Sequence, residues 1–343
     1  MNILFITSDQ QRADCYGFEG RKVKTPHLDM LAREGTRFSA CITPNLVCQP
    51  TRASILTGLL PSTHGVSDNG IDLPDATGEA GYAGDFGRAG YSTGYIGKAH
   101  FKTSNTFKAT GSPECRLTEQ RDDWYGPYMG WNHVELMVEG HNTRAPRKPP
   151  FTQHYERWYY ADGRGEEKNR LLFSKLPPLS DAAQTYHSGL PVAWHNSTWI
   201  GDRTIEFLRA NKDKPFCAWA SFPDPHHPFD CPEPWSRLHH PDEAWPVFTV
   251  TAESAEKLAE LPARPGGPAR CHRVRRRCQP RDGRVRRRRR AAHARRVHHP
   301  TRPTLLGTTA LSSGALSLWC SGGSGWGSGW GSGWHGAGVS SHG

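Results

Sequence analysis

Apolar runs and segments of helical periodicity alternate along the front of the chain. Asn2–Thr7 is a short apolar run that leads into Asp9, which is typical of a buried parallel strand whose carboxyl end carries function. Further on, Thr25 and Pro26 offer an N-cap and a first-turn proline, and apolar residues then recur at helical spacing up to Gly35. The pattern therefore predicts a strand followed by a helix.

The same alternation recurs twice further along the chain. A short helix over Gly81–Ala89 is expected before a strand over Tyr91–Ile96. A longer helix capped by Asn196 is expected before the apolar strand Phe216–Phe222. Strand–helix alternation of this kind predicts an α/β fold with a mainly parallel central sheet and helices on both faces.

Polar residues that could carry chemistry follow three of the predicted strands. Asp9, Lys98, His100 and His226 each stand at or just after a strand end. Since ligands in α/β folds bind beyond the carboxyl ends of parallel strands, we expect these side chains to gather at one edge of the sheet. Residues 105–195 are rich in Pro, Gly, Trp, Tyr and charge without a clear period, and we expect long substrate-side loops there.

Composition narrows the class of protein. The chain has 343 residues and nine Cys at irregular spacings. No apolar stretch reaches the roughly 18 residues of a membrane span, and Met1 and Asn2 lead directly into an apolar run without a basic leader. We therefore expect one large or two ordinary domains without a membrane segment, in a cytoplasmic protein with reduced thiols.

The net charge of +10 is unevenly distributed. Residues 264–343 hold 16 Arg, no Lys and a single acid, Asp282, so they carry +15 and residues 1–263 carry −5. We therefore divide the chain into a front part, 1–263, and a basic tail, 264–343, that becomes rich in Gly, Ser and Trp. The tail is expected to be disordered, because it has too little apolar surface to offset the chain entropy.

Two interpretations of the tail stay open. It lacks Phe, Tyr, Met, Ile, Asn and Lys, whose codons are rich in A and T, as expected when a GC-rich gene is translated out of frame. This pattern predicts a frameshift near Ala263. Alternatively, the runs 273–277 and 284–290 form a nucleic-acid-binding arm that neutralises phosphates in a salt-sensitive way.

The most informative stretch is Cys48–Gly58. A proline two residues after Cys48 fits the first turn of a helix, and apolar residues continue that helix. A helix N-terminus stabilises a thiolate or a bound oxyanion, and Arg52, one turn on, would add a fixed cation. The alternative for an isolated motif is a buried Cys beside a surface Arg.

Cys-x-Pro-Thr-Arg followed by Leu-Thr-Gly resembles the signature of the sulfatases, which are formylglycine-dependent hydrolases related to alkaline phosphatase. The continuation Leu60–Val66 resembles that family as well. The resemblance covers about residues 1–260, and it implies an alkaline-phosphatase-like fold. It also implies that Cys48 is oxidised to formylglycine by a formylglycine-generating or other sulfatase-maturing enzyme.

Three further stretches resemble family motifs. Ile6–Gln10 resembles the first-strand metal motif, in which Asp9 would bind a divalent cation. Many members have a second Asp where this chain has Gln10, and this difference resembles the choline-sulfatase and phosphonate-monoesterase branches. Gly97–His100 resembles the Gly-Lys-x-His motif, and Ser221–Phe229 resembles the Pro-His-x-Pro-Phe motif.

The resemblance implies a role for each matching residue. One hydroxyl of the hydrated aldehyde at Cys48 would attack sulfur, and the second would then expel sulfate from the covalent intermediate. Lys98 and His226 would neutralise the ester oxygens, and His100 would take the proton of the diol. Arg52 would anchor the diol.

The implied cofactor is one divalent cation. Asp9 and the modified Cys48 would bind it through oxygen, which favours Ca²⁺, with Mg²⁺ or Mn²⁺ as alternatives. The family places a second metal-binding pair and another sulfate-binding Lys well beyond His226, and nothing after Ala263 supplies them. We therefore expect weak metal binding, a missing C-terminal subdomain and an inactive chain as translated. Asp68–Gly70 resembles the missing pair, but we interpret it as a turn.

Three functions stay open from the sequence. The first is hydrolysis of a small-molecule sulfate ester to an alcohol and sulfate. The second is hydrolysis of a phosphonate or phosphate monoester at the same site, which Gln10 keeps open. The third is an inactive truncated relative whose Arg-rich tail binds nucleic acid.

Overall fold

The structure is a computed structural model that describes residues 1–20, 22–103, 123–137, 153–179, 184–239 and 317–321, with residues 114, 117, 146, 148, 149 and 181. These residues belong to one compact unit, Met1–Ala244 with Thr308–Gly343. A second unit, Trp245–Gly307, lies outside the described residues. The division at residue 263 and the frameshift near it therefore stay predictions.

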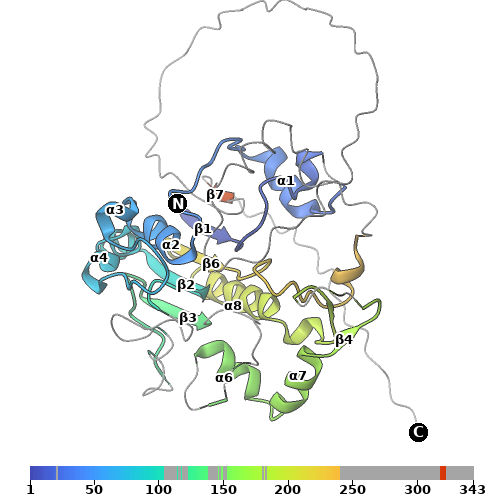
Figure 1. The fold of residues 1–343 in the computed structure, drawn as a ribbon. Helices are drawn as coiled ribbons and strands as arrows, with labels where there is room; N and C mark the ends of the chain where they lie inside the picture. The colour runs from blue at the N-terminus through green and yellow to red at the C-terminus, as the bar shows by residue number, and fades with distance from the viewer. Residues whose placement is uncertain are drawn as a thin grey trace, which may run out of the picture. The chain divides into compact units, whose positions relative to one another are not determined.

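A five-stranded sheet of order β3-β2-β6-β1-β7 forms the centre of this unit (Figure 1). Its first four strands in that order pair in parallel, as predicted. The strands are β1 (Asn2–Thr7), β2 (Ser92–Lys98), β3 (His133–Met137), β6 (Phe216–Ser221) and β7 (Ser317–Ser321). The fold is therefore α/β with a mainly parallel sheet.

β7 lies antiparallel to β1 at one edge of the sheet. It belongs to the tail, whose expected disorder stays a prediction. The runs 273–277 and 284–290, on which the nucleic-acid interpretation depends, lie outside the described residues.

Alternating side chains explain why the sheet packs on both faces. Phe5, Tyr95 and Trp219 stand in register on three neighbouring strands and face the same side, with ring centroids 4.9 and 5.1 Å from Trp219. Ile96 and Ala218 face the opposite side and belong to a second apolar cluster. Because consecutive strand residues point to opposite faces, short apolar runs supply both cores.

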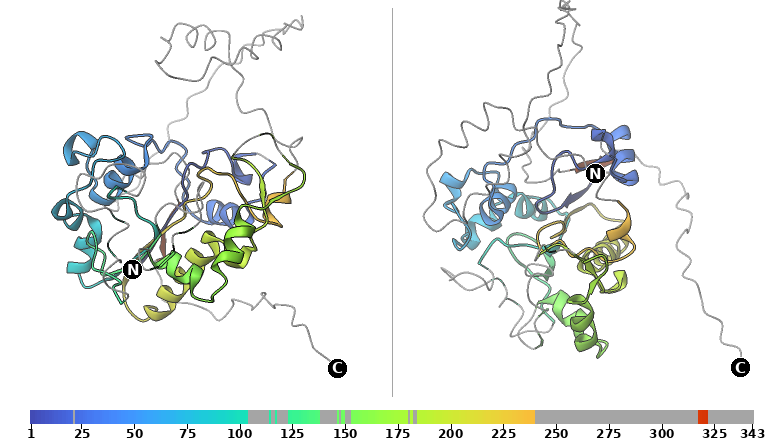
Figure 2. Two further views of the ribbon diagram at one scale, coloured as in Figure 1. Left: turned by 60° about the horizontal axis from the view of Figure 1, so that its bottom comes forward. Right: turned by 45° about the vertical axis from the view of Figure 1, so that its right-hand side comes forward.

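Helices cover the two faces, with the early helices on one side and the later ones on the other (Figures 1 and 2). The first group comprises α2 (Cys48–Thr57), α3 (Pro61–His64), α4 (Asp75–Glu79) and α5 (Tyr82–Arg88). The second face is packed by α6 (His154–Tyr160) and α8 (Asn196–Ala210). The predicted helix after β1 is α1 (Pro26–Glu34), beside the short 3₁₀ helix η1 (Gly17–Glu19).

The expectation of loops over residues 105–195 is wrong for much of the described part. This region contains β3, α6, α7 (Gly165–Leu172), the two-stranded sheet of β4 (Lys175–Leu176) and β5 (His187–Ser188), and η3 (Val192–Trp194). In α7, a polar residue occupies a buried position where an amphipathic helix usually has an apolar one. Lys168 is buried and donates to the Tyr159 carbonyl at 2.6 Å, so periodicity alone missed α7.

The start of α8 differs slightly from the prediction. The N-cap of α8 is His195, whose side chain accepts from the Ser197 amide, rather than Asn196, so that prediction is wrong by one residue. The 3₁₀ helix η4 (Trp235–Arg237) ends the described front of the chain. Among the described residues, no helix combines the length and apolar character needed to cross a bilayer.

Candidate active site

The helix α2 begins at Cys48, so the expected position of this residue at a helix N-terminus is confirmed. The first turn is fixed by the turn at Asp68–Gly70, which the structure confirms as a turn. The Gln49 amide donates to Asn69 Oδ1 at 3.0 Å, and the Gly70 amide donates to Gln49 Oε1 at 2.8 Å. These contacts hold the Cys48 end of α2 in place.

Asp9, Arg52 and Lys98 meet beyond the ends of β1 and β2. Lys98 Nζ lies 2.7 Å from Asp9 Oδ2, and Arg52 Nη2 lies 3.3 Å from the same oxygen. All three side chains are buried, and Lys98 is only 1% exposed. We call these three residues, together with His100 two positions after Lys98, the cationic cluster.

Arg52 also connects three elements through its second terminal nitrogen. Nη1 donates to the Lys98 carbonyl at 2.6 Å, to Ser221 Oγ at 2.8 Å and to Tyr95 Oη at 3.3 Å. Ser221 in turn donates to the Lys98 carbonyl at 2.7 Å. Sequence reasoning missed Ser221 and Tyr95. The one available signal was a polar residue closing the apolar run of β6.

Gly97 lets β2 and β6 approach closely beside this network. Its φ is +107°, and a Cβ there would lie 2.1 Å from the Ser221 carbonyl oxygen. Only glycine adopts this conformation and fits this space without strain. Gly97 therefore determines the backbone position from which the Lys98 side chain extends.

The cationic cluster carries more positive than negative charge. Burial raises the pKa of Asp9, but the charges of Lys98 and Arg52 outweigh burial and hold that pKa well below its usual range. One ionised carboxylate therefore faces two cations. Burying the remaining positive charge is costly unless an anion binds beside it.

His100 brings a neutral imidazole to the same place. It is 4% exposed, and neither ring nitrogen has a hydrogen-bond partner among the described residues. Burial, with the charges of Lys98 and Arg52, lowers its pKa well below the ordinary value. A buried imidazole with two unpaired nitrogens fits a site that completes its hydrogen bonds with a ligand or a modified neighbour.

Glu114 positions the segment that carries His100, and sequence reasoning missed it. Its carboxylate accepts from the amides of His100 at 2.7 Å, Phe101 at 2.9 Å and Lys102 at 3.3 Å. Tyr128 Oη donates to it at 3.0 Å. One buried carboxylate thus fixes three consecutive backbone amides behind the cluster.

His226 and Cys48 lie in the electrostatic field of the cluster. Cys48 begins the helix that carries Arg52, and His226 interacts electrostatically with both Lys98 and Asp9. Burial first, and then Lys98, lowers the pKa of His226. Asp9, Arg52 and Lys98 are thus in direct contact, while the roles expected of Cys48 and His226 stay predictions.

The residues present fit a hard cation only in part. Oδ2 of Asp9 already contacts Lys98 and Arg52, and Gln10 Oε1 lies 3.3 Å from His227 Nδ1. A Ca²⁺ ion takes about six to eight oxygens. Asp9 and a modified Cys48 would supply only the first of these.

A second polar cluster was not foreseen from the sequence. His195, Asp224 and Asp230 each offer a ligand atom, and these atoms lie within 4.8 Å of one another. We call these residues the acidic cluster. Burial and the charge of Asp224 raise the pKa of Asp230 to about 7, and burial lowers the pKa of His195.

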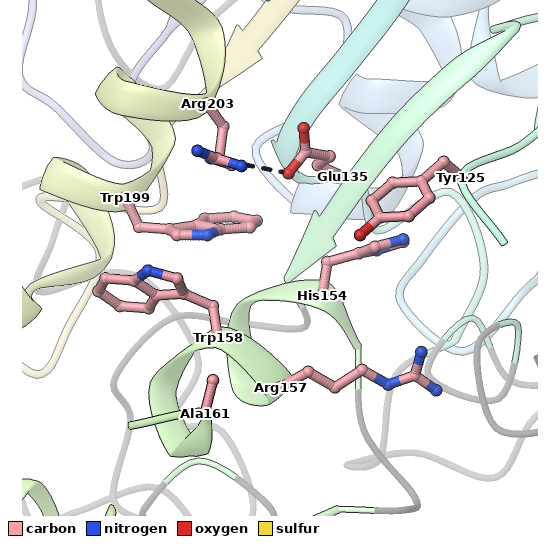
Figure 3. Close-up of a pocket in the computed structure, with 8 residues that line it drawn as sticks. All are labelled: Tyr125, Glu135, His154, Arg157, Trp158, Ala161, Trp199 and Arg203. Carbon is pink, nitrogen blue, oxygen red and sulfur yellow. Dashed lines mark ion pairs between the residues drawn. The ribbon is translucent and has the colours of Figure 1, made fainter. Parts of the chain in front are cut away.

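A cavity of about 330 Å³ opens elsewhere, between α6, α8 and β3 (Figure 3). Trp158, Trp199 and Tyr125 line it with aromatic rings, and Arg203 pairs with Glu135 at 4.0 Å on its wall. No member of the cationic cluster lines this cavity. This cavity is therefore distinct from the residues of the cationic cluster.

Comparison with known proteins defines the class that this fold and site represent. A model of the sulfatase family matches residues 1–244, and the chain belongs to the sulfatase family, in the alkaline-phosphatase-like superfamily. The arylsulfatase of Clostridium perfringens is 30% identical over 243 residues, which cover 68% of this chain and 44% of that protein. The choline-sulfatase of Rhizobium meliloti is 31% identical over 66% of this chain and 39% of its own length.

Among solved structures, the phosphonate monoester hydrolase of Agrobacterium radiobacter is similar with a TM-score of 0.54 and 25% identity. The match covers 75% of this chain and 47% of that protein. The uncharacterized sulfatase YidJ of Escherichia coli is 29% identical over 67% of this chain and 39% of its own length. The chain thus spans less than half the length of these relatives.

Proposed function

We propose that this chain carries the nucleophile, anion-binding and first metal-binding residues of a sulfuric-ester hydrolase. The observation that supports this function best is the buried cluster of Asp9, Arg52 and Lys98, which has surplus positive charge and whose Arg52 lies on the helix that begins at Cys48. A sulfate ester brings the negative charge that this cluster lacks. Membership of the sulfatase family supports the same reaction.

Each residue has a role that follows from its contacts. Lys98 is held by Asp9 at its ammonium group, so it presents a fixed charge to a sulfate oxygen, and His226 interacts electrostatically with both residues. Arg52 is fixed by the Lys98 carbonyl and Ser221, and it anchors the hydroxyls at position 48. His100 stays neutral and can accept a proton at an unpaired nitrogen.

Two groups would be supplied from elsewhere. Formylglycine made from Cys48 by a sulfatase-maturing enzyme would supply a hydrated aldehyde as nucleophile. A divalent cation, Ca²⁺ before Mg²⁺ or Mn²⁺, would be held by Asp9 and residue 48, and it would lower the pKa of the diol. These assignments rest on the family and on the oxygen donors present.

The first test is the mass of the peptide that contains Cys48 after co-expression with a formylglycine-generating enzyme. Conversion of the thiol to the aldehyde lowers this mass by about 18 Da. The converted chain is then assayed with an aryl sulfate, and its affinity for inorganic sulfate is measured by calorimetry. We expect conversion and sulfate binding even where the partial chain turns over slowly.

Matched variants make this test specific. Lys98→Ala should lower sulfate affinity at least about tenfold, because a buried charge–charge contact is lost. Lys102→Ala is the control, since Lys102 lies on the same segment but pairs with Asp75 at 2.7 Å. An unmodified Cys48, or equal sulfate affinity in both variants, would contradict the proposal.

A phosphonate or phosphate monoester is the second candidate substrate. Gln10 in the metal motif and the likeness to a phosphonate monoester hydrolase both favour it. Turnover of an aryl sulfate, an aryl phosphonate and an aryl phosphate by the converted chain separates the two. A higher kcat/KM for the phosphonate would reassign the reaction while leaving the site residues unchanged.

The nucleic-acid interpretation of the tail remains a separate proposal. Retention of the full chain on heparin should fall with salt if residues 264–343 bind phosphates. A chain ending at residue 263 that is retained equally would contradict it.

A further inference from the structure

Three titratable side chains come together at the turn that follows β6. His195 precedes α8, while Asp224 and Asp230 begin and end the turn that holds His226. Their ligand atoms lie within 4.8 Å of one another. Ligands of a metal with bonds of about 2.0–2.2 Å lie roughly 3–4 Å apart, so the group needs to close by about 1 Å to bind an ion.

An unsatisfied oxygen points independently to a missing cation. Asp230 is 3% exposed, and its Oδ2 has no hydrogen-bond partner among the described residues. Over the same described residues, no ion pair joins Asp224 or Asp230 to a Lys or an Arg. A buried carboxylate oxygen without a donor or a cation is costly, because nothing replaces its lost hydration.

Existing contacts show which groups are held in place. Asp224 Oδ2 accepts from Ser197 Oγ at 2.5 Å and lies 4.0 Å from His195 Nδ1. Nδ1 also accepts a long bond of 3.3 Å from the Ser197 amide, which an ion would replace. Both partners of Asp224 therefore come from the start of α8.

We propose that His195, Asp224 and Asp230 bind a Zn²⁺ ion that fixes the turn carrying His226. One imidazole nitrogen and two carboxylates suit Zn²⁺, which binds nitrogen and oxygen ligands at low coordination number. Asp224 is 34% exposed at its side chain, which leaves a path for the ion and a place for water as a fourth ligand.

The position of this site gives the ion a structural role. The backbone oxygen of Asp224 accepts from the Asp9 amide at 3.2 Å, so the turn is tied directly to the cationic cluster. His226 lies within the turn, between the two aspartates. An ion joining Asp224 and Asp230 to His195 would hold this turn against the start of α8. It would thereby fix the position of His226 relative to Asp9.

The experiment measures Zn²⁺ bound by the full chain after dialysis, together with the thermal shift that Zn²⁺ causes. Thiols elsewhere also bind zinc, so the readout is the difference between variants. Asp230→Asn and Asp224→Asn should each lose one equivalent or at least about 100-fold in affinity. Asp202→Asn, an exposed aspartate on α8, is the matched control and should change neither quantity.

A further variant separates this site from the catalytic one. Lys98→Ala, which is used above to weaken sulfate binding, should keep the zinc equivalent and its thermal shift, because Lys98 is no ligand of this ion. An anomalous difference map at the zinc edge from the wild-type chain should place a peak between the three side chains. Equal zinc content in wild type and Asp230→Asn, or an anomalous map without that peak, would overturn the proposal, and failure of sulfate binding would leave it untouched.

Discussion

The cationic cluster and the acidic cluster are joined through the same turn and carry opposite imbalances of charge. In the cationic cluster, Asp9 is shared between two cations, so positive charge remains. In the acidic cluster, two carboxylates and one imidazole lie within 4.8 Å of one another, and neither carboxylate pairs with a Lys or an Arg among the described residues. One site therefore favours an anion and the other a cation.

The comparison shows that burial alone does not say what a charged residue does. Asp9 and Asp230 are similarly buried, at 6% and 3% exposure. The pKa of Asp9 is held well below its usual range, whereas that of Asp230 rises to about 7. The difference comes from the neighbours, which are cations in the first case and another carboxylate in the second.

The largest effect should come from Asp9→Asn. This change leaves Lys98 and Arg52 buried without a counter-charge, so the free energy of unfolding should fall by about 3–5 kcal/mol. Urea denaturation at pH 8 with a metal chelator measures it. Asp85→Asn removes an exposed partner of Arg88 and should change stability by less than about 1 kcal/mol. Equal effects of the two changes would mean that Asp9 does not neutralise the cluster.

A smaller effect should come from His154, which belongs to neither cluster. Its Nδ1 accepts from the Leu136 amide at 3.0 Å, and its Nε2 faces the Trp124 carbonyl at 2.8 Å. Burial lowers the pKa of His154 to about 4. The unfolded chain binds this proton first, so stability should fall by up to about 3 kcal/mol as the pH drops from about 6.5 to about 4.

The imidazole titration of His154 can be followed directly by NMR. His154→Asn should flatten the pH dependence over this interval, which gives the baseline against which pH effects in the two clusters are judged. A pKa near 6.5 for His154 would show that its nitrogens are accessible to water and would remove this baseline.

The smallest effect, of opposite sign, should come from Asp230→Asn in the presence of a chelator. Removing one of two neighbouring carboxylates relieves repulsion, so stability at pH 8 should rise or stay within about 1 kcal/mol of wild type. The same change should cancel the stabilisation that Zn²⁺ gives the wild-type chain. A loss as large as that of Asp9→Asn would show that the two clusters do not differ in charge balance.

The parallel strands and the residues at their ends could be predicted because each depends on local sequence. Asn2–Thr7 and Phe216–Ser221 are apolar runs of strand length, and both are strands in the structure. Asp9 and Lys98 were placed together because parallel strands share an edge, and they are 2.7 Å apart. The helical start at Cys48 followed from the proline in its first turn.

The missed features depend on contacts between distant parts of the chain. Glu114 reaches a segment more than ten residues earlier, and Ser221 contacts Arg52 from the far end of the unit. The acidic cluster joins His195 to residues about thirty positions later. A polar residue in such a place has no period or motif, so the sequence marks it no differently from a surface residue.

The grip of Glu114 on three consecutive amides has a consequence for exchange with solvent. The amides of His100, Phe101 and Lys102 each donate to its carboxylate, so their hydrogens should exchange with deuterium only when these hydrogen bonds break. Their exchange rates therefore measure local opening of this segment. They report whether the segment behind the cationic cluster is closed before any substrate, modification or ion is added.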